Sequence, residues 1–141
     1  IRLGNVKHNT QSSAADSDAL REIVVHEGIQ LVYEINEHRD VEHKGQHINQ
    51  YRFICKRMSN LTLTIILTGI GRAQHRIEII LQEEGARATI FGATALSGSA
   101  HQTIELVQEH QAPNTISNSL FLSGLTEQAV LKYEGKINIF K

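Results

Sequence analysis

The sequence predicts an all-β protein of about nine or ten short strands, arranged as a parallel β-helix. Apolar residues recur at every second position over most of the chain, which is the period of a strand with one buried face. Short polar segments, several with glycine, separate these runs as turns would. Periodicity alone leaves a sandwich, a barrel and a β-helix open. The β-helix is favoured because apolar residues recur in every run, as stacked coils require, and because the hairpin dipeptides Asn-Gly and Asp-Gly are absent.

The runs follow one another from residue 29 to the end of the chain. Residues 1–22 are polar and predict an N-terminal arm or edge turn, whereas 23–141 predict a core domain that we expect to be truncated at its C-terminus. Strand-favouring residues dominate the alternating runs at 29–36, 61–68, 76–81, 88–92, 103–108, 120–124, 129–135 and 137–140. We expect the apolar faces of 61–67, 77–81, 104–106 and 137–139 to stack inside.

Composition excludes several classes of protein. The net charge of −1 argues against a general nucleic-acid-binding surface, which needs a basic face. No apolar run is long enough to predict a membrane-spanning helix. The single cysteine, Cys55, cannot form an internal disulfide or build a cysteine-rich metal site by itself. We therefore expect a protein of a reducing, cytoplasmic compartment with neither a nucleic-acid partner nor a membrane partner.

The most suggestive metal-binding pattern is HRDVEHKGQH, which contains His38, His43 and His47. Three imidazoles could bind a borderline metal. On a strand, however, His38 and His43 would point to opposite faces, and charged neighbours such as Arg39 and Glu42 are typical of a solvated loop. We predict that this segment binds no metal.

The other candidate residues are also predicted to have structural roles. Cys55 lies in the apolar run YRFICKR and is expected to be a small core residue rather than a nucleophile. TGIGRAQHR, residues 68–76, has two glycines but no phosphate-binding spacing, so the glycines are expected to serve a turn. Glu83 and Glu84 precede a turn glycine and are expected to be solvated. Since no serine-hydrolase motif occurs either, we predict no catalytic, cofactor-binding or metal-binding residues.

The segment EHQAPNTISNSLFLSG, residues 109–124, contains the only proline of the chain. Pro113 lacks an N–H group and disfavours a helical residue before it, so the chain should bend there in an extended form. Polar side chains on either side can hydrogen-bond to nearby backbone groups. We expect His110 and Ser117 to stabilise a structural corner by bonding to the backbone.

The stretch from Arg76 to Phe140 resembles the core domain of the SufB/SufD family, the scaffold proteins of the SUF iron–sulfur cluster assembly system. The resemblance runs through RIEIILQEEGARATIFGATALSG, then His101 and ELVQEHQAPNTISNS, and finally AVLKYEGKINIF. The sequence departs from the family pattern at Thr103, where an acidic residue is common, and at Tyr133, where phenylalanine is usual. The family's later Cys-Ser-His-Gly-Ala-Thr-like segment does not occur before Lys141. No functional residue of the family is therefore carried over.

The resemblance implies a right-handed parallel β-helix and a non-enzymatic scaffold, closer to SufD than to SufB. It implies pairing with a SufB/SufD-type partner, or a homodimer through residues 128–141, and contact with a SufC-type ATPase through a segment not in this chain. No cofactor is expected in this fragment, and an iron–sulfur cluster is expected only in the full assembly. The alternatives are a carbohydrate-binding or carbohydrate-active β-helix and a cupin-like metal-binding protein. The low aromatic content, 5 %, and the absence of tryptophan argue against stacking on sugars.

Overall fold

The computed structural model describes residues 2–11, 20–39 and 47–140, which form ten β-strands and no helix. The strands are β1 (Arg2–Gln11), β2 (Leu20–Val25), β3 (Ile29–Arg39), β4 (His47–Cys55), β5 (Asn60–Gly69), β6 (Arg72–Leu81), β7 (Arg87–Leu96), β8 (His101–His110), β9 (Ile116–Leu125) and β10 (Val130–Ile139). Within this part of the chain, no helix is long and apolar enough to span a membrane.

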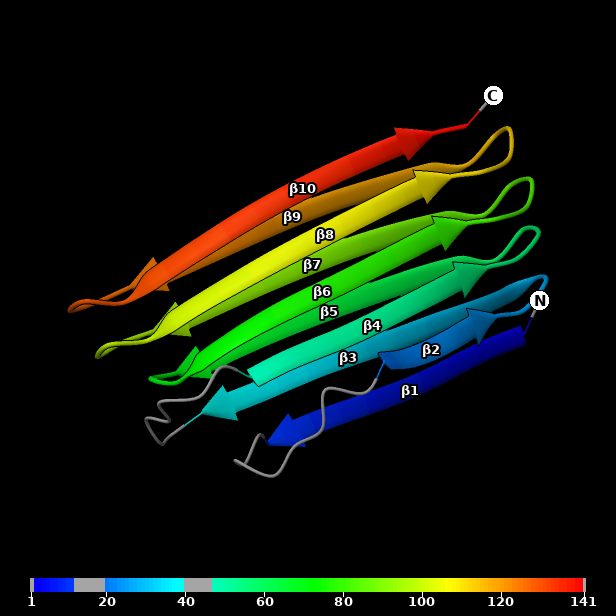
Figure 1. Cartoon of the computed structure of the whole chain (residues 1–141). Coiled ribbons are helices and arrows are strands. Elements are labelled where there is room, and N and C mark those ends of the chain that lie inside the picture. The colour runs from blue at the N-terminus through cyan, green and yellow to red at the C-terminus, as the bar shows by residue number, and fades with distance from the viewer. Residues whose placement is uncertain (1, 12–19, 40–46, 141) are drawn as a thin grey trace.

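The strands form two parallel sheets that face each other, as Figure 1 shows. The odd sheet has the order β1-β3-β5-β7-β9, and the even sheet has the order β10-β8-β6-β4-β2. Successive strands alternate between the sheets, so each coil of the chain adds one strand to each. Every strand pair is parallel, which confirms a β-solenoid and rules out a meander, an antiparallel sandwich or a cupin-like barrel.

Alternation of burial along each strand places the hydrophobic core between the two sheets. In β5 every second residue from Leu61 to Leu67 is buried, and β6 and β7 repeat the pattern. Because parallel neighbours pair in register, inward residues stack coil upon coil, as in the ladder of Phe53, Ile79 and Gln108. Tyr33 and Phe53 also pack edge to face across the interior, with ring centroids 5.2 Å apart.

Turns stack at the two ends of the strands. Four of them, at one end, contain a residue with positive φ: Gly28, Met58, Gly85 and Asn114. These turns also bond to one another, since the Met58 amide donates to the Glu84 carbonyl and the Gly28 amide donates to the Arg57 carbonyl. At the other end, Gly69 and Gly71 form the turn between β5 and β6, as the sequence predicts for TGIG.

The outward faces of the two sheets differ in charge. The even sheet carries a ladder of ion pairs in which Arg52 bridges Glu22 and Glu78, and Arg76 bridges Glu78 and Glu105. Hydrogen bonding to Glu78 raises the pKa of Arg52, and hydrogen bonding to Glu105 raises the pKa of Arg76. The odd sheet carries no such ladder among the residues with described side chains, and its outward positions on β5, β7 and β9 are almost all uncharged.

Two parts of the chain differ from the sequence-based expectations. The stretch 1–22, expected to be a polar arm or edge turn, contains β1, which pairs with β3 from Arg2 to Gln11, and the start of β2. The apolar faces of 61–67, 77–81 and 104–106 are buried as predicted, but the prediction for 137–139 was wrong. Ile137 is 61 % exposed and Ile139 is 73 % exposed, because β10 is an edge strand of its sheet and no other coil of the described residues covers it.

Candidate functional site

A chain of buried polar side chains crosses the interior between the two sheets. Glu37 and Arg39 come from β3, Asn49 from β4, His75 from β6 and Gln102 from β8. All five are at most 6 % exposed. Buried polar groups are costly unless they are paired, so a connected set near one end of the strands, within a mainly apolar interior, is the most unusual feature of the interior.

The hydrogen bonds within this set of buried polar side chains are consistent with one arrangement of protons. Asn49 Nδ2 donates to Glu37 Oε2 over 2.7 Å, and since a carboxylate only accepts, the amide of Asn49 must present its NH₂ group there. The same nitrogen lies 3.3 Å from His75 Nδ1, which therefore accepts. His75 Nε2 then carries the proton and donates to Gln102 Oε1 over 3.0 Å. The network thus assigns the tautomer of His75 and the orientation of Asn49.

The ion pair at one end of the polar chain is fully buried. Arg39 Nε donates to Glu37 Oε1 over 3.2 Å, and both side chains are 2 % exposed. Arg39 Nη2 has no hydrogen-bond partner among the described residues. The turn after β5 makes room for this arginine, because a Cβ atom on Gly71 would lie 2.6 Å from Arg39 Cδ, and one on Gly69 would overlap the Arg39 carbonyl. The charged neighbours of Arg39 in the sequence predict a solvated loop, and this prediction is wrong, because Arg39 is the last residue of β3 and points inward.

The arrangement is suited to hydrogen bonding and to holding a fixed charge pair inside the solenoid. It is not a metal site by composition, since Asn49, Arg39 and Gln102 are poor ligands for a transition metal. Among the described residues, no group of three or more His, Cys, Asp and Glu side chains is placed to hold a metal ion. A polar chain of this kind can orient a small polar species or pass a proton between neighbouring groups.

Cys55 lies in the same interior but in an apolar part of it. The thiol is fully buried, and burial raises its pKa to about 12, although a hydrogen bond with Ser59 lowers it in part. A thiol with such a pKa stays protonated at neutral pH and is therefore neither a nucleophile nor a ready metal ligand. The sequence-based interpretation of Cys55 as a small core residue is confirmed.

The histidine-rich segment is described only in part. His38 lies on the outward side of β3, where its Nδ1 atom is 2.7 Å from Thr68 Oγ1. His43 lies outside the described residues, as do Asp40 and Glu42, and nothing is stated of the His47 side chain. That the segment binds no metal stays a prediction. Glu83 and Glu84 are exposed at the turn after β6, as expected.

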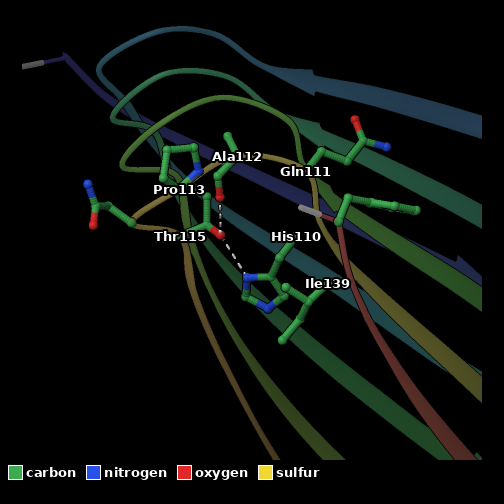
Figure 2. Close-up of a pocket in the computed structure, with 8 residues that line it drawn as sticks. His110, Gln111, Ala112, Pro113, Thr115 and Ile139 are labelled. Atoms are coloured by element: carbon green, nitrogen blue, oxygen red, sulfur yellow. Dashed lines mark hydrogen bonds between the residues drawn. The ribbon is translucent and has the colours of Figure 1, made fainter.

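The corner after β8 is held by a short relay of side chains (Figure 2). His110 Nδ1 lies 2.7 Å from Thr115 Oγ1, which donates to the Ala112 carbonyl over 3.1 Å. His110 Nε2 lies 3.0 Å from Ser117 Oγ. The expectation that His110 and Ser117 bond directly to backbone was wrong, since they bond to each other and reach the backbone through Thr115. The corner has the structural role that the sequence predicts, because each hydroxyl and ring nitrogen of the relay has a partner.

A pocket of about 450 Å³ lies beside this corner, as Figure 2 shows. Its lining comes from the corner and from the end of β10: His110, Gln111, Ala112, Pro113, Asn114, Thr115, Ile139 and Phe140. Ile139 and Phe140 are both exposed. The pocket therefore belongs to the open last coil rather than to the closed interior.

Among the described residues, the last coil has a neighbouring coil on one side only. Tyr133, Ile137 and Ile139 occupy inward positions of β10, in register with inward residues of β8, yet they are 42 %, 61 % and 73 % exposed. Phe121 on β9 packs against Tyr133 with ring centroids 4.8 Å apart. One long edge of β9 and one of β10 have no neighbour among the described strands. Such an end exposes apolar side chains together with unpaired backbone groups.

Sequence reasoning missed the polar chain, although the sequence holds a signal for it. In β6 the inward residues Ile77 and Ile79 continue backwards to His75, and in β8 Ile104 continues backwards to Gln102. Extending each alternating run by one step would have placed these two polar residues inside. Extending the run of β3 forwards from Ile35 likewise reaches Glu37 and Arg39. Alternation does not reveal that Glu37 pairs with Asn49, because the two residues belong to different sheets.

Comparison with known families gives one match. A family described as "SUF system FeS cluster assembly, SufBD core domain" matches residues 4–141, and thus extends well beyond the stretch from Arg76 to Phe140 that carried the resemblance. Neither curated proteins nor solved structures give a match to this chain.

Proposed function

Because this chain belongs to the SufBD core-domain family of the SUF iron–sulfur cluster assembly system, we propose that it is a SufD-like, non-enzymatic scaffold subunit. In this proposal it pairs with a SufB/SufD-type partner. A SufC-type ATPase supplies the nucleotide chemistry and contacts the scaffold through a segment not in this chain. The family match over 4–141 is the observation that carries the proposal.

The open last coil supports a pairing role. Solenoids expose an apolar cross-section at an uncovered end, and they need a cap or a partner there. The exposed side chains of Tyr133, Ile137 and Ile139 form such a cross-section, and the free edge of β10 offers backbone groups for strand pairing. We place the pairing surface at residues 128–141, which would be covered by a partner core domain or by a second copy of this chain.

The single cysteine supports a subunit that does not hold a cluster by itself. Cys55 is buried in the apolar core with a raised pKa, so it is not available as a cluster ligand in this fold. In the proposal the cluster is cargo of the full assembly, and the protein works in the cytoplasm. A carbohydrate-binding site would need aromatic side chains gathered on one face. Phe91 lies on the outward face of the odd sheet, whereas Tyr133 lies inward on β10, so these two aromatic residues form no such platform.

Co-expression with the SufB-type and SufC-type proteins of the same source tests the proposal. We expect a stable complex with one copy of this chain for each SufB-type chain, measured by light scattering after size exclusion. The double substitution Ile137→Glu with Ile139→Glu should abolish pairing without lowering the melting temperature, since both side chains are exposed. Val24→Glu, at an exposed position on β2, is the matched control and should leave pairing intact.

Two results would contradict the proposal. One is the failure of the SufB-type chain to co-purify with the unchanged protein. The other is a complex that survives the end substitutions, which would place the pairing surface elsewhere. A homodimer that forms in the absence of the partner, and that the end substitutions dissociate, would identify a second copy as the occupant of this surface.

A further inference from the structure

The outward face of the odd sheet carries an apolar patch that the pairing role does not use. The patch consists of nine outward positions on three neighbouring strands, and we call it the uncharged patch: Thr64, Ile66, Thr68, Phe91, Ala93, Ala95, Leu120, Leu122 and Gly124. Parallel register brings them into three rows, since Thr64, Phe91 and Leu120 are neighbours, as are Ile66, Ala93 and Leu122. Phe91, Leu120 and Leu122 are 45 %, 55 % and 65 % exposed.

The two outward faces differ in charge, and the lack of charge on the patch points to a partner surface that is also uncharged there. None of the nine positions is ionisable, whereas the opposite face of the solenoid carries a ladder of ion pairs. Polar residues border the patch: Glu34 and His38 lie on β3 beside its first strand, and Arg87 lies at the start of β7. An apolar centre with a polar rim is the usual anatomy of a docking surface.

The size of the patch selects the kind of partner. Three strands about 4.8 Å apart and five residues at about 3.3 Å give roughly 14 Å by 17 Å, on the order of 240 Å². A stable interface between two folded proteins buries about 800 Å² on each side, so a second copy stacked on this patch alone would not dimerise stably. One α-helix of three turns is about 10–12 Å wide and about 16 Å long, which matches the patch.

The side chains of the patch also suit a helix. Small residues such as Ala93, Ala95 and Thr68 allow a close approach to the sheet, while Phe91 and Leu122 project as anchors between the apolar side chains of the incoming segment. Apolar faces of parallel sheets are commonly covered by helices in folded proteins. We propose that the uncharged patch docks the apolar side of an amphipathic helix supplied by a partner subunit, an inference that rests on the proposed function because it places that partner in the same assembly.

Photo-crosslinking in the intact complex tests this inference directly. A benzophenone side chain replaces Leu122, and in a matched protein it replaces Val24 on the opposite sheet. After co-expression with the SufB-type and SufC-type proteins and irradiation, we expect a covalent adduct only from position 122. Peptide mass spectrometry should map it to one side of a helix in a partner subunit.

Affinity gives the second measurement. Leu120→Glu with Leu122→Glu should raise the dissociation constant of the complex on the order of tenfold, because charge would face the apolar side of the helix. Val24→Glu should leave it unchanged. Circular dichroism should show intact folding for both proteins, and Leu122→Gln provides a milder change that keeps the test valid if the double variant unfolds.

The outcomes separate this inference from the proposed function. A complex that forms normally but gives no adduct from position 122 overturns the docking inference alone, as does an unchanged dissociation constant. An adduct joining two copies of this chain, or an adduct to a segment that is not helical, also overturns it. Failure of the complex to form contradicts the proposed function and this inference together.

Discussion

The middle coils and the last coil of the solenoid use the same inward positions with opposite results. One ladder runs through Phe53, Ile79, Gln108 and Ile137, which are 0 %, 0 %, 3 % and 61 % exposed. Ile79 and Ile137 are the same residue type in strands of the same sheet, so the strand sequence does not explain the difference. Burial in a solenoid comes from having a coil on both sides, and among the described strands the last coil has one on a single side.

The largest expected effect separates the two isoleucines of that ladder. Ile79→Ala should lower the free energy of unfolding by about 2–5 kcal/mol, since it removes buried methyl groups and leaves a cavity. Ile137→Ala should change it by less than about 0.5 kcal/mol, because the side chain is already in solvent. Urea unfolding followed by circular dichroism measures both. Equal losses would show that the last coil is covered in solution.

The polar chain gives the next effect. Asn49→Leu removes the donor to Glu37 and to His75 and leaves a buried carboxylate with one partner fewer, so we expect a loss of about 2–3 kcal/mol. Asn118→Leu, at an exposed position on β9, is the control in the last coil and should change the free energy of unfolding by less than about 0.5 kcal/mol. If Asn49→Leu melts like the unchanged protein, the network does not stabilise the middle coils.

The pH dependence of the free energy of unfolding should show that Cys55 is buried in the middle coils. Its pKa is raised from 9.0 to about 12 in the folded state, so its contribution to stability is fully present below pH 9 and is lost as the pH rises towards 12. Between pH 9 and pH 11 we expect the unchanged protein to lose up to about 2 kcal/mol more than Cys55→Ala does. Parallel curves for the two proteins would contradict this.

A cysteine introduced in the last coil provides a second measurement of the difference in exposure between the coils. Ile139 occupies that position in the last coil, in register with His110 and then Leu81 and Cys55. In a Cys55→Ala background, Ile139→Cys should react with a thiol reagent in the native state, whereas Cys55 should react only after unfolding.

The cost of backbone strain should be the same in the middle coils and in the last coil. Met58 and Glu127 both have φ near the left-handed region, at 55° and 57°, although Met58 lies between middle coils and Glu127 in the last coil. Met58→Gly and Glu127→Gly should each raise the free energy of unfolding by about 0.5–1 kcal/mol, because glycine adopts this conformation without a steric penalty. A gain at one position alone would show that side-chain contacts decide the outcome there.

The smallest effect is expected on the charged ladder outside the even sheet. Arg52 is about one-third exposed and bridges two carboxylates, so Arg52→Gln should lower the free energy of unfolding by about 0.5 kcal/mol at low salt and by less at high salt. Lys132→Gln, which breaks a well-exposed pair with Glu134 in the last coil, should have no measurable effect. Thermal melts at two ionic strengths compare the two variants.

The strands could be predicted from the sequence because each one depends on its own alternation. Runs such as LTLTIILT place Leu61, Leu63 and Ile65 on one side whatever lies next to them, and the structure buries all three. The parallel arrangement needed more than periodicity. It rested on the scarcity of hairpin signals and on the family resemblance, because alternation does not reveal which strands become neighbours.

The polar chain and the open end could not be predicted in the same way. Glu37 and Arg39 continue an alternating pattern in β3, but polar residues at the end of a run are usually solvated, and only the glycines of the next coil reveal the room made for Arg39. Ile137 and Ile139 have the pattern of a buried strand, yet they are exposed because no coil beyond β10 lies in the part of the chain that the structure describes. Local pattern carries no information about such neighbours.

The stacked turns have a consequence for how such a molecule could change in length. Gly28, Met58, Gly85 and Asn114 return the chain at the same end of successive coils. Backbone bonds join the first turn to the second and the second to the third, and the Asn114 side chain donates to Glu84 between the third and the fourth. The polypeptide therefore enters each successive coil at an equivalent position and in the same direction. Duplication or deletion of one whole coil would leave the remaining joints unaltered, so evolution could adjust the distance between the two ends of the protein in discrete steps.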